Sequence, residues 1–72
     1  MAQLTDYGKE IKKRLIDKGE TQEWLISEVS KESGLFLDGG YLYKIMTGQR
    51  TAPKIIAAIN KILGLEVREA NT

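Results

Sequence analysis

Asp38-Gly-Gly-Tyr-Leu-Tyr-Lys-Ile-Met-Thr-Gly-Gln-Arg-Thr-Ala-Pro53 is the stretch that decides the fold of this 72-residue chain. Its first residue is of a helix-capping type, and Leu42 and Ile45, three positions apart, give one apolar face to a helix over residues 39–47. A glycine ends that helix, and the final proline favours the start of another, since its missing N–H costs nothing in the first turn. The stretch therefore predicts a short surface helix followed by a basic turn.

Three further helices are predicted on either side of this stretch. A first helix begins at Thr5 or Asp6 and ends at Gly19, a second runs from Gln22 to about Ser33 behind a Thr21 cap and before Gly34, and a fourth runs from Pro53 to Gly64. Their apolar residues recur at helical spacing and supply the expected core: Tyr7, Ile11, Leu15, Ile16, Leu25, Ile26, Val29, Leu42, Ile45, Ile55 or Ile56, Ile59, Ile62 and Leu63. We expect a compact all-α domain of four to five helices over residues 1–65, with a tail over residues 66–72.

Composition excludes several kinds of site. The chain has no cysteine and no histidine, so disulfides, zinc sites built on thiolates or imidazoles, and histidine-dependent nucleophiles are ruled out. We expect no enzymatic activity, no cofactor and no small-molecule substrate. The longest apolar run, Ile55-Ile-Ala-Ala-Ile59, is far short of the roughly 20 residues of a membrane span. We therefore expect a cytoplasmic protein that does not enter a membrane.

Charge is divided unevenly along the chain, although the net charge is only +1. Residues 20–38 carry five carboxylates (Glu20, Glu23, Glu28, Glu32 and Asp38) against Lys31 alone, and residues 39–65 carry no carboxylate and four cations (Lys44, Arg50, Lys54 and Lys61). Binding to phosphate depends on where cations cluster and not on their sum. The second half of the chain is the half suited to nucleic acid.

In order and spacing, these elements resemble the Cro/C1-type, lambda-repressor-like helix-turn-helix family of phage and mobile-element regulators. The resemblance rests on Thr21-Gln-Glu-x-Leu25, Leu42-x-x-Ile45-x-x-Gly48-Gln-Arg50, Pro53 to Ile59, and Leu63-Gly-Leu65. It implies a sequence-specific DNA-binding transcriptional regulator, repressor-like, that acts as a homodimer on double-stranded DNA with helix 39–47 in the major groove. The residues that would contact DNA by position are Gln22, Gly39, Gly40, Tyr41, Tyr43, Lys44, Thr47, Gln49, Arg50 and Lys54.

Two features depart from the pattern of this family. The turn between the second and third helices is enlarged by about six residues and contains Leu35, Phe36 and Leu37. Because no helix or strand can turn three consecutive side chains to one core, at least one of them should stay exposed as an interface residue, and we expect it to be Phe36. The second departure is Gly39-Gly40, where the family usually places base-reading side chains. Direct readout would fall to Tyr41, Tyr43 and Lys44.

A protein-interaction module with the same helical shape is the alternative. In this reading the chain is an antirepressor or modulator that binds another regulator protein. The small net charge, the bare Gly39-Gly40 pair and the apolar insertion at Leu35 to Leu37 favour it. Salt-dependent retention on duplex DNA, compared with co-purification of a partner regulator, separates the two hypotheses.

Overall fold

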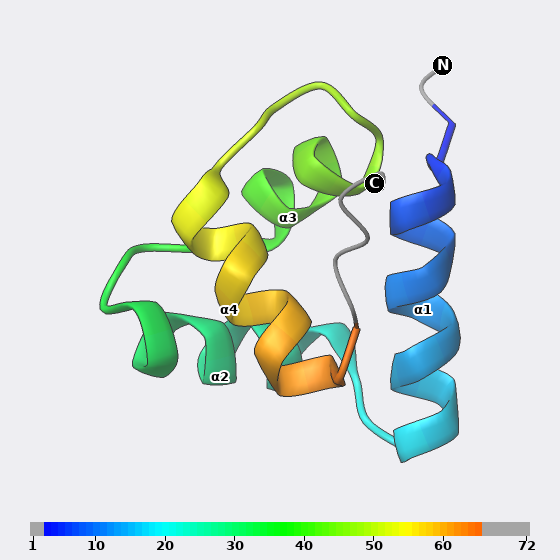
Figure 1. The fold of residues 1–72 in the computed structure, drawn as a ribbon, viewed down its shortest axis with the longest axis horizontal. Helices are drawn as coiled ribbons and strands as arrows, with labels where there is room; N and C mark the ends of the chain where they lie inside the picture. Colours follow the sequence, from blue (N-terminus) through cyan, green and yellow to red (C-terminus); the bar gives the residue numbers. More distant parts are fainter. Residues whose placement is uncertain (1–2, 66–72) are drawn as a thin grey trace.

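Four helices form the fold in the computed structural model, which describes residues 3–65. They are α1 (Asp6–Lys18), α2 (Gln22–Ser33), α3 (Gly39–Met46) and α4 (Pro53–Leu63), and no strand occurs within these described residues. Figure 1 shows α4 crossing α2, with α1 standing along one side and α3 at the far end of α4 from Gly64. The predicted all-α architecture is confirmed. The tail expected over residues 66–72 lies outside the described residues.

The helix boundaries follow from local capping chemistry. The side chains of Thr5, Thr21 and Asp38 each accept a hydrogen bond from a backbone N–H in the first turn of the helix that follows. Such caps satisfy N–H groups that have no partner inside the helix. Pro53 occupies the first turn of α4, and α1, α2 and α4 each end on a glycine with a φ of 71°. The predicted starts of all four helices and the glycine stops of α1, α2 and α4 are therefore confirmed, whereas α3 ends at Met46, one residue before the predicted end at position 47.

The core lies between the four helices and is almost wholly aliphatic. Its buried members are Ile11, Leu15, Leu25, Val29, Leu37, Leu42, Ile45, Met46, Ala52, Ile55, Ala58, Ile59 and Leu63. Tyr7, Trp24, Ile26, Ile56 and Ile62 are half-buried and pack against it. Each helix thus buries a stripe at helical spacing, as the sequence predicts.

Two side chains differ from the expected pattern. Ile16, expected beside the stripe of the first helix, is 78% exposed, because it is one residue, or about 100° around the helix, beyond buried Leu15. Tyr41, expected on an exposed face, is half-buried against the core. It lies four residues before buried Ile45 and therefore shares the inward face of α3.

The linker between α2 and α3 divides its three apolar residues. Leu37 is buried in the core with 4% of its surface exposed, whereas Leu35 is 40% and Phe36 is 74% exposed. The expectation that one of the three remains outside is confirmed, and Phe36 is the most exposed of them. The predicted interface therefore narrows to Leu35 and Phe36, since Leu37 serves the core.

Helix α1 holds the C-terminal end of α3 in place. The backbone N–H and the hydroxyl of Thr5 both donate to the carbonyl of Met46, each at 3.0 Å. Gly8 sits directly against the backbone of Met46 and has no room for a Cβ. The absence of a side chain at Gly8 is what allows the two helices to approach so closely. The orientation of α3 relative to the rest of the molecule is fixed by this contact.

None of the helices within residues 3–65 has the length and apolar character that crossing a membrane requires.

Candidate nucleic-acid interface

Helix α3 turns Leu42, Ile45 and Met46 into the core and presents its opposite side to solvent. That outer side carries Lys44, which is exposed, and Tyr43, which is 48% exposed. The first turn of α3 is also exposed and consists of Gly39 and Gly40. An α-helix with a cation and an aromatic hydroxyl on its open face is an element that can enter the major groove of DNA.

The turn after α3 is folded back onto the end of the helix. The Thr47 hydroxyl donates to the carbonyl of Tyr43 at 2.9 Å, and the Gln49 side-chain amide donates to the Thr47 hydroxyl at 2.8 Å. The backbone N–H groups of Gln49 and Arg50 both donate to the carbonyl of Lys44, at 2.8 and 3.2 Å. Gly48 makes this reversal possible with a φ of 79°. The polar residues of the turn are thereby held beside Lys44.

Arg50 extends from this turn across the start of α3. Its guanidinium carbon lies 5.0 Å from the centre of the Tyr41 ring, within the range of a cation–π contact. Arg50, Lys44 and Tyr41 line one surface hollow together with Gly40, Asp38 and Phe36; we call this the α3 hollow. Two cations that are six residues apart in sequence therefore converge on one surface.

Asp38 modifies the charge of the α3 hollow. Its carboxylate oxygen Oδ1 accepts from the backbone N–H of Tyr41 at 2.8 Å, so the positive end of the α3 dipole already holds an anion. A phosphate approaching the backbone of the first turn would meet this carboxylate. The suggestion that the glycines bring a phosphate to the N-terminus of the helix is therefore weakened, and the cations at Lys44 and Arg50 are the stronger anion contacts.

The two glycines of the first turn lie in open surroundings. A Cβ at Gly39 would meet no atom within 4 Å, and a Cβ at Gly40 would meet only the Asp38 side chain at 3.7 Å. Neither has a positive φ. Packing and backbone geometry therefore do not require glycine at these positions, although each glycine weakens the helix by about 0.5–1 kcal/mol relative to alanine.

Six of the ten predicted contact residues do not line the α3 hollow: Gly39, Tyr43 and Gln49 are next in sequence to residues that do, whereas Gln22, Thr47 and Lys54 lie elsewhere. Gln22, at the first turn of α2, lines a second hollow with Lys12, Leu15, Ile16 and Glu20; we call this the α1–α2 hollow. Lys54 lines a third, between α2 and α4, with Glu32 and Lys61. Thr47 lies at the C-terminal end of α3, where its hydroxyl donates to carbonyls of the helix and orders the turn. These three residues do not form one cluster with the α3 hollow.

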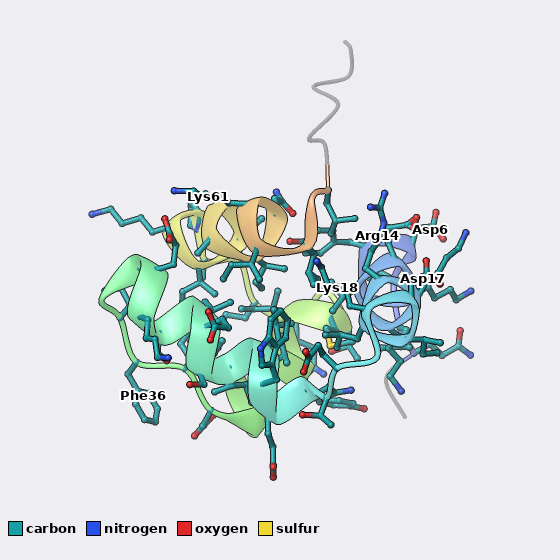
Figure 2. The ribbon with its side chains drawn as sticks, turned by 90° about the horizontal axis from the view of Figure 1, so that it is seen from below. Asp6, Arg14, Asp17, Lys18, Phe36 and Lys61 are labelled. Carbon is teal, nitrogen blue, oxygen red and sulfur yellow. The ribbon has the colours of Figure 1, made fainter. Side chains whose placement is uncertain are left out.

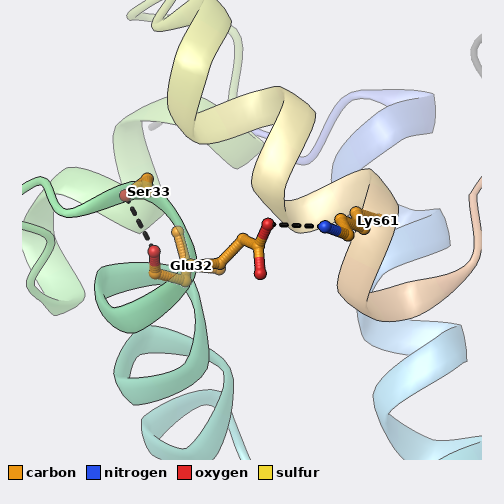
Figure 3. Close-up of polar contacts among 4 residues, drawn as sticks. Glu32, Ser33 and Lys61 are labelled. Carbon is orange, nitrogen blue, oxygen red and sulfur yellow. Dashed lines mark hydrogen bonds and ion pairs between the residues drawn. The ribbon is translucent and has the colours of Figure 1, made fainter.

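The four cations of residues 39–65 are not equivalent. Lys61 of α4 donates to the carboxylate of Glu32 on α2 at 2.8 Å (Figure 3). The hydrogen bond to Glu32 and its negative charge raise the pKa of Lys61. The charge of Lys61 is therefore paired with that of Glu32 in a salt bridge that joins α2 to α4. Within residues 3–65, the only other salt bridge is that of Lys31 with Glu28, at 3.6 Å, so Lys44, Arg50 and Lys54 form none there.

Some residues that shape the interface were not predicted from the sequence. Thr5 and Gly8 position α3 although they are more than thirty residues away in sequence. A glycine inside an otherwise helical segment is a signal of close backbone approach, and Gly8 offered that signal. Asp38 was predicted as a cap, but its place beside Lys44 and Arg50 depends on the fold.

No protein-family model, no curated protein and no solved structure matches this chain. Among the described residues there is no group of three or more acidic, cysteine or histidine side chains that could hold a metal ion.

Proposed function

We propose that this chain is a helix-turn-helix DNA-binding regulator that lays the outer face of α3 in the major groove. The observation that carries the proposal is the convergence of Lys44 and Arg50 on one side of a helix whose C-terminal end is fixed by α1. A recognition element must be held rigidly for its side chains to meet base edges in register. The lambda-repressor-like resemblance of the sequence supports the same conclusion and implies repression.

Different residues would perform different tasks on DNA. Lys44 and Tyr43 project from the exposed side of α3 and are placed to reach base edges. Arg50, and the side-chain amide of Gln49, lie in the ordered turn and are suited to the phosphate backbone. Gln22 and Lys54 lie outside the α3 hollow and would contact phosphates farther along the duplex.

A second candidate function rests on Phe36. An aromatic side chain that is 74% exposed at the edge of the α3 hollow is better suited to an apolar protein surface than to a phosphate backbone. In this alternative, the chain modulates another regulator protein by binding it.

Substitution of the two hollow cations tests the DNA proposal. Arg50→Ala should weaken binding to all duplex sequences alike and lower the magnitude of the salt slope by about 0.9, the contribution of one phosphate contact. Lys44→Ala should cost about 1–3 kcal/mol on the cognate duplex, and much less on random duplex, if Lys44 reads bases. Fluorescence anisotropy over a series of salt concentrations measures both quantities.

Lys13→Ala is the matched control, because Lys13 is an exposed cation of α1 that lines none of the three hollows. It should leave the salt slope within error of the unmodified chain. If Arg50→Ala leaves the slope unchanged as well, Arg50 makes no phosphate contact. Equal losses for Lys44→Ala on both duplexes would show that it anchors phosphate rather than reading sequence.

A further inference from the structure

Two apolar side chains in the described part of the chain are far more exposed than the rest. Phe36 is 74% and Ile16 is 78% exposed. Figure 2 shows Phe36 projecting away from the body of the molecule. A single exposed apolar side chain is ordinary on a protein surface, so exposure alone decides nothing. What surrounds each of the two is informative.

Each of these side chains lines a hollow that also contains charges of both signs. Phe36 is in the α3 hollow, with Lys44, Arg50 and Asp38. Ile16 is in the α1–α2 hollow, with Glu20 and Lys12. If the two hollows face one another, Glu20 can pair with Lys44 or Arg50, and Lys12 can pair with Asp38, around a contact between Phe36 and Ile16. Each surface thus offers an exposed apolar side chain and a charge opposite to one on the other surface.

We propose that copies of this chain associate head to tail, with Phe36 of one copy seated against Ile16 in the α1–α2 hollow of the next. Because the two surfaces are different, the contact is heterologous. Association of this kind builds an open chain or a closed ring of copies instead of a two-fold dimer. It differs from the symmetric homodimer that the family resemblance implies.

The contact is small, since it consists of one aromatic side chain and a rim of charges. Stable interfaces bury about 1,200 Å² or more, so association should be weak in free solution. Because Lys44 and Arg50 line the α3 hollow and are also the proposed DNA contacts, duplex binding and this contact would compete for the same surface. This last consequence rests on the proposed function, but the contact itself does not.

Disulfide trapping tests the contact without DNA, and the natural absence of cysteine makes the result unambiguous. Phe36→Cys and Ile16→Cys chains are mixed in equal amounts in a glutathione redox buffer. We expect the mixed disulfide to exceed its statistical share about tenfold, since the contact raises the effective concentration of the two thiols. Ser27→Cys, at an exposed position of α2 that lines none of the three hollows, replaces either partner as the control and should give only statistical pairing.

A statistical mixture from Phe36→Cys and Ile16→Cys would overturn the proposal. So would a dominant disulfide between two Phe36→Cys chains, which would indicate a two-fold contact through Phe36. Thermal melting checks that each variant folds. Leu35→Cys with Lys12→Cys is a second pair for the same test. Leu35 precedes Phe36 in the sequence, and Lys12 lines the α1–α2 hollow with Ile16.

A charge exchange tests the orientation of the contact. Glu20→Lys in the Ile16→Cys chain should lower the yield of mixed disulfide, and Lys44→Glu in the Phe36→Cys chain should restore it. Failure of the exchange to restore the yield would contradict the pairing of Glu20 with Lys44. Because these measurements contain no DNA, their failure leaves the DNA-binding proposal standing, and a loss of DNA binding leaves the head-to-tail contact standing.

Discussion

Gly8 and the Gly39-Gly40 pair show how residues of one type can serve opposite purposes. Gly8 faces the backbone of Met46 with no room for a side chain, whereas both glycines of α3 face open space. The first is required by packing. The other two cost helix stability, and neither packing nor backbone geometry requires them.

Alanine substitution should separate the two cases. Gly39→Ala and Gly40→Ala should each raise the free energy of unfolding by about 0.5–1 kcal/mol, because alanine restricts the unfolded chain and favours the helix. Gly8→Ala, the contrasting variant, should lower it by about 1–3 kcal/mol through overpacking against Met46. Urea unfolding measures all three.

The same two α3 variants should weaken duplex binding if the α3 backbone approaches DNA closely. A gain in stability with unchanged binding would show that nothing approaches the start of α3 in the complex.

Tyr7 joins α1 to α4 through a hydrogen bond from its hydroxyl to Oδ1 of buried Asn60, at 2.7 Å. Burial raises the pKa of Tyr7 to about 12, against about 10 in an unfolded chain. Above pH 10 the unfolded chain therefore loses this proton before the folded chain does. Stability should be complete below pH 10 and should fall as the pH rises from 10 to 12.

Chemical unfolding at a series of alkaline pH values measures this dependence. The expected loss is about 1–2 kcal/mol, less than the full shift implies because Tyr7 is only half-buried. Tyr7→Phe should cost about 1 kcal/mol at neutral pH, since Asn60 loses its donor, and should flatten the alkaline slope. An equal slope in both proteins would assign the alkaline loss to other groups.

At the level of single elements, α3 depends on one cap that also carries a charge. Asp38 accepts from the backbone N–H of Tyr41 and shares the α3 hollow with Lys44 and Arg50. Its cap stabilises the helix, and its charge opposes an incoming anion. Two substitutions can separate these effects because asparagine retains the capping oxygen and alanine does not.

Asp38→Asn should keep the stability of the fold nearly unchanged and should increase affinity for random duplex, since one carboxylate leaves a cationic surface. Asp38→Ala should increase the same affinity but lower the free energy of unfolding by about 1 kcal/mol. Thermal melting and anisotropy on the two proteins provide the comparison. If neither variant binds duplex more tightly, the α3 hollow does not face DNA.

The helices are the part of this molecule that the sequence predicts best, because the residues that cap and end each helix are next to it in the sequence. Thr21 and Asp38 cap the helices that directly follow them, and Gly34 ends the helix before it. Side-chain positions that depend on contacts between distant parts of the sequence are harder to predict. Met46 shares the inward face of α3 because it lies four residues after Leu42, but no local pattern encodes the close approach of its backbone to Gly8.

The candidate interface was predictable as a set of residues but not as an arrangement. The sequence indicated Lys44 and Arg50, and the structure brings them together because the turn at Gly48 reverses the chain. The sequence could not indicate that Lys61 would pair with Glu32, because these two residues lie on different helices whose crossing is set by the core. Tyr41 is not on the exposed face expected for it, because its ring packs against the core beneath α3.

Across the whole molecule, the uneven charge of the sequence is only partly retained in space. Glu32 from the acidic segment lies against Lys61 from the basic segment where α2 crosses α4 (Figure 3). Lys44 and Arg50 remain together at the α3 hollow, away from this crossing. Two cations are thus retained together at the α3 hollow, and the small net charge conceals this.

Mapping the DNA-contact surface by amide chemical shifts is the most direct test of the proposed function. A random-sequence duplex at low salt is sufficient, because contacts to phosphate do not depend on sequence. The account predicts that the largest shifts fall on Tyr41 to Arg50, with smaller ones at Gln22 and Lys54 and almost none at Lys9 to Lys13 of α1. Shifts concentrated on α1, or no shift at any amide at the lowest salt, would contradict the proposal that α3 binds DNA.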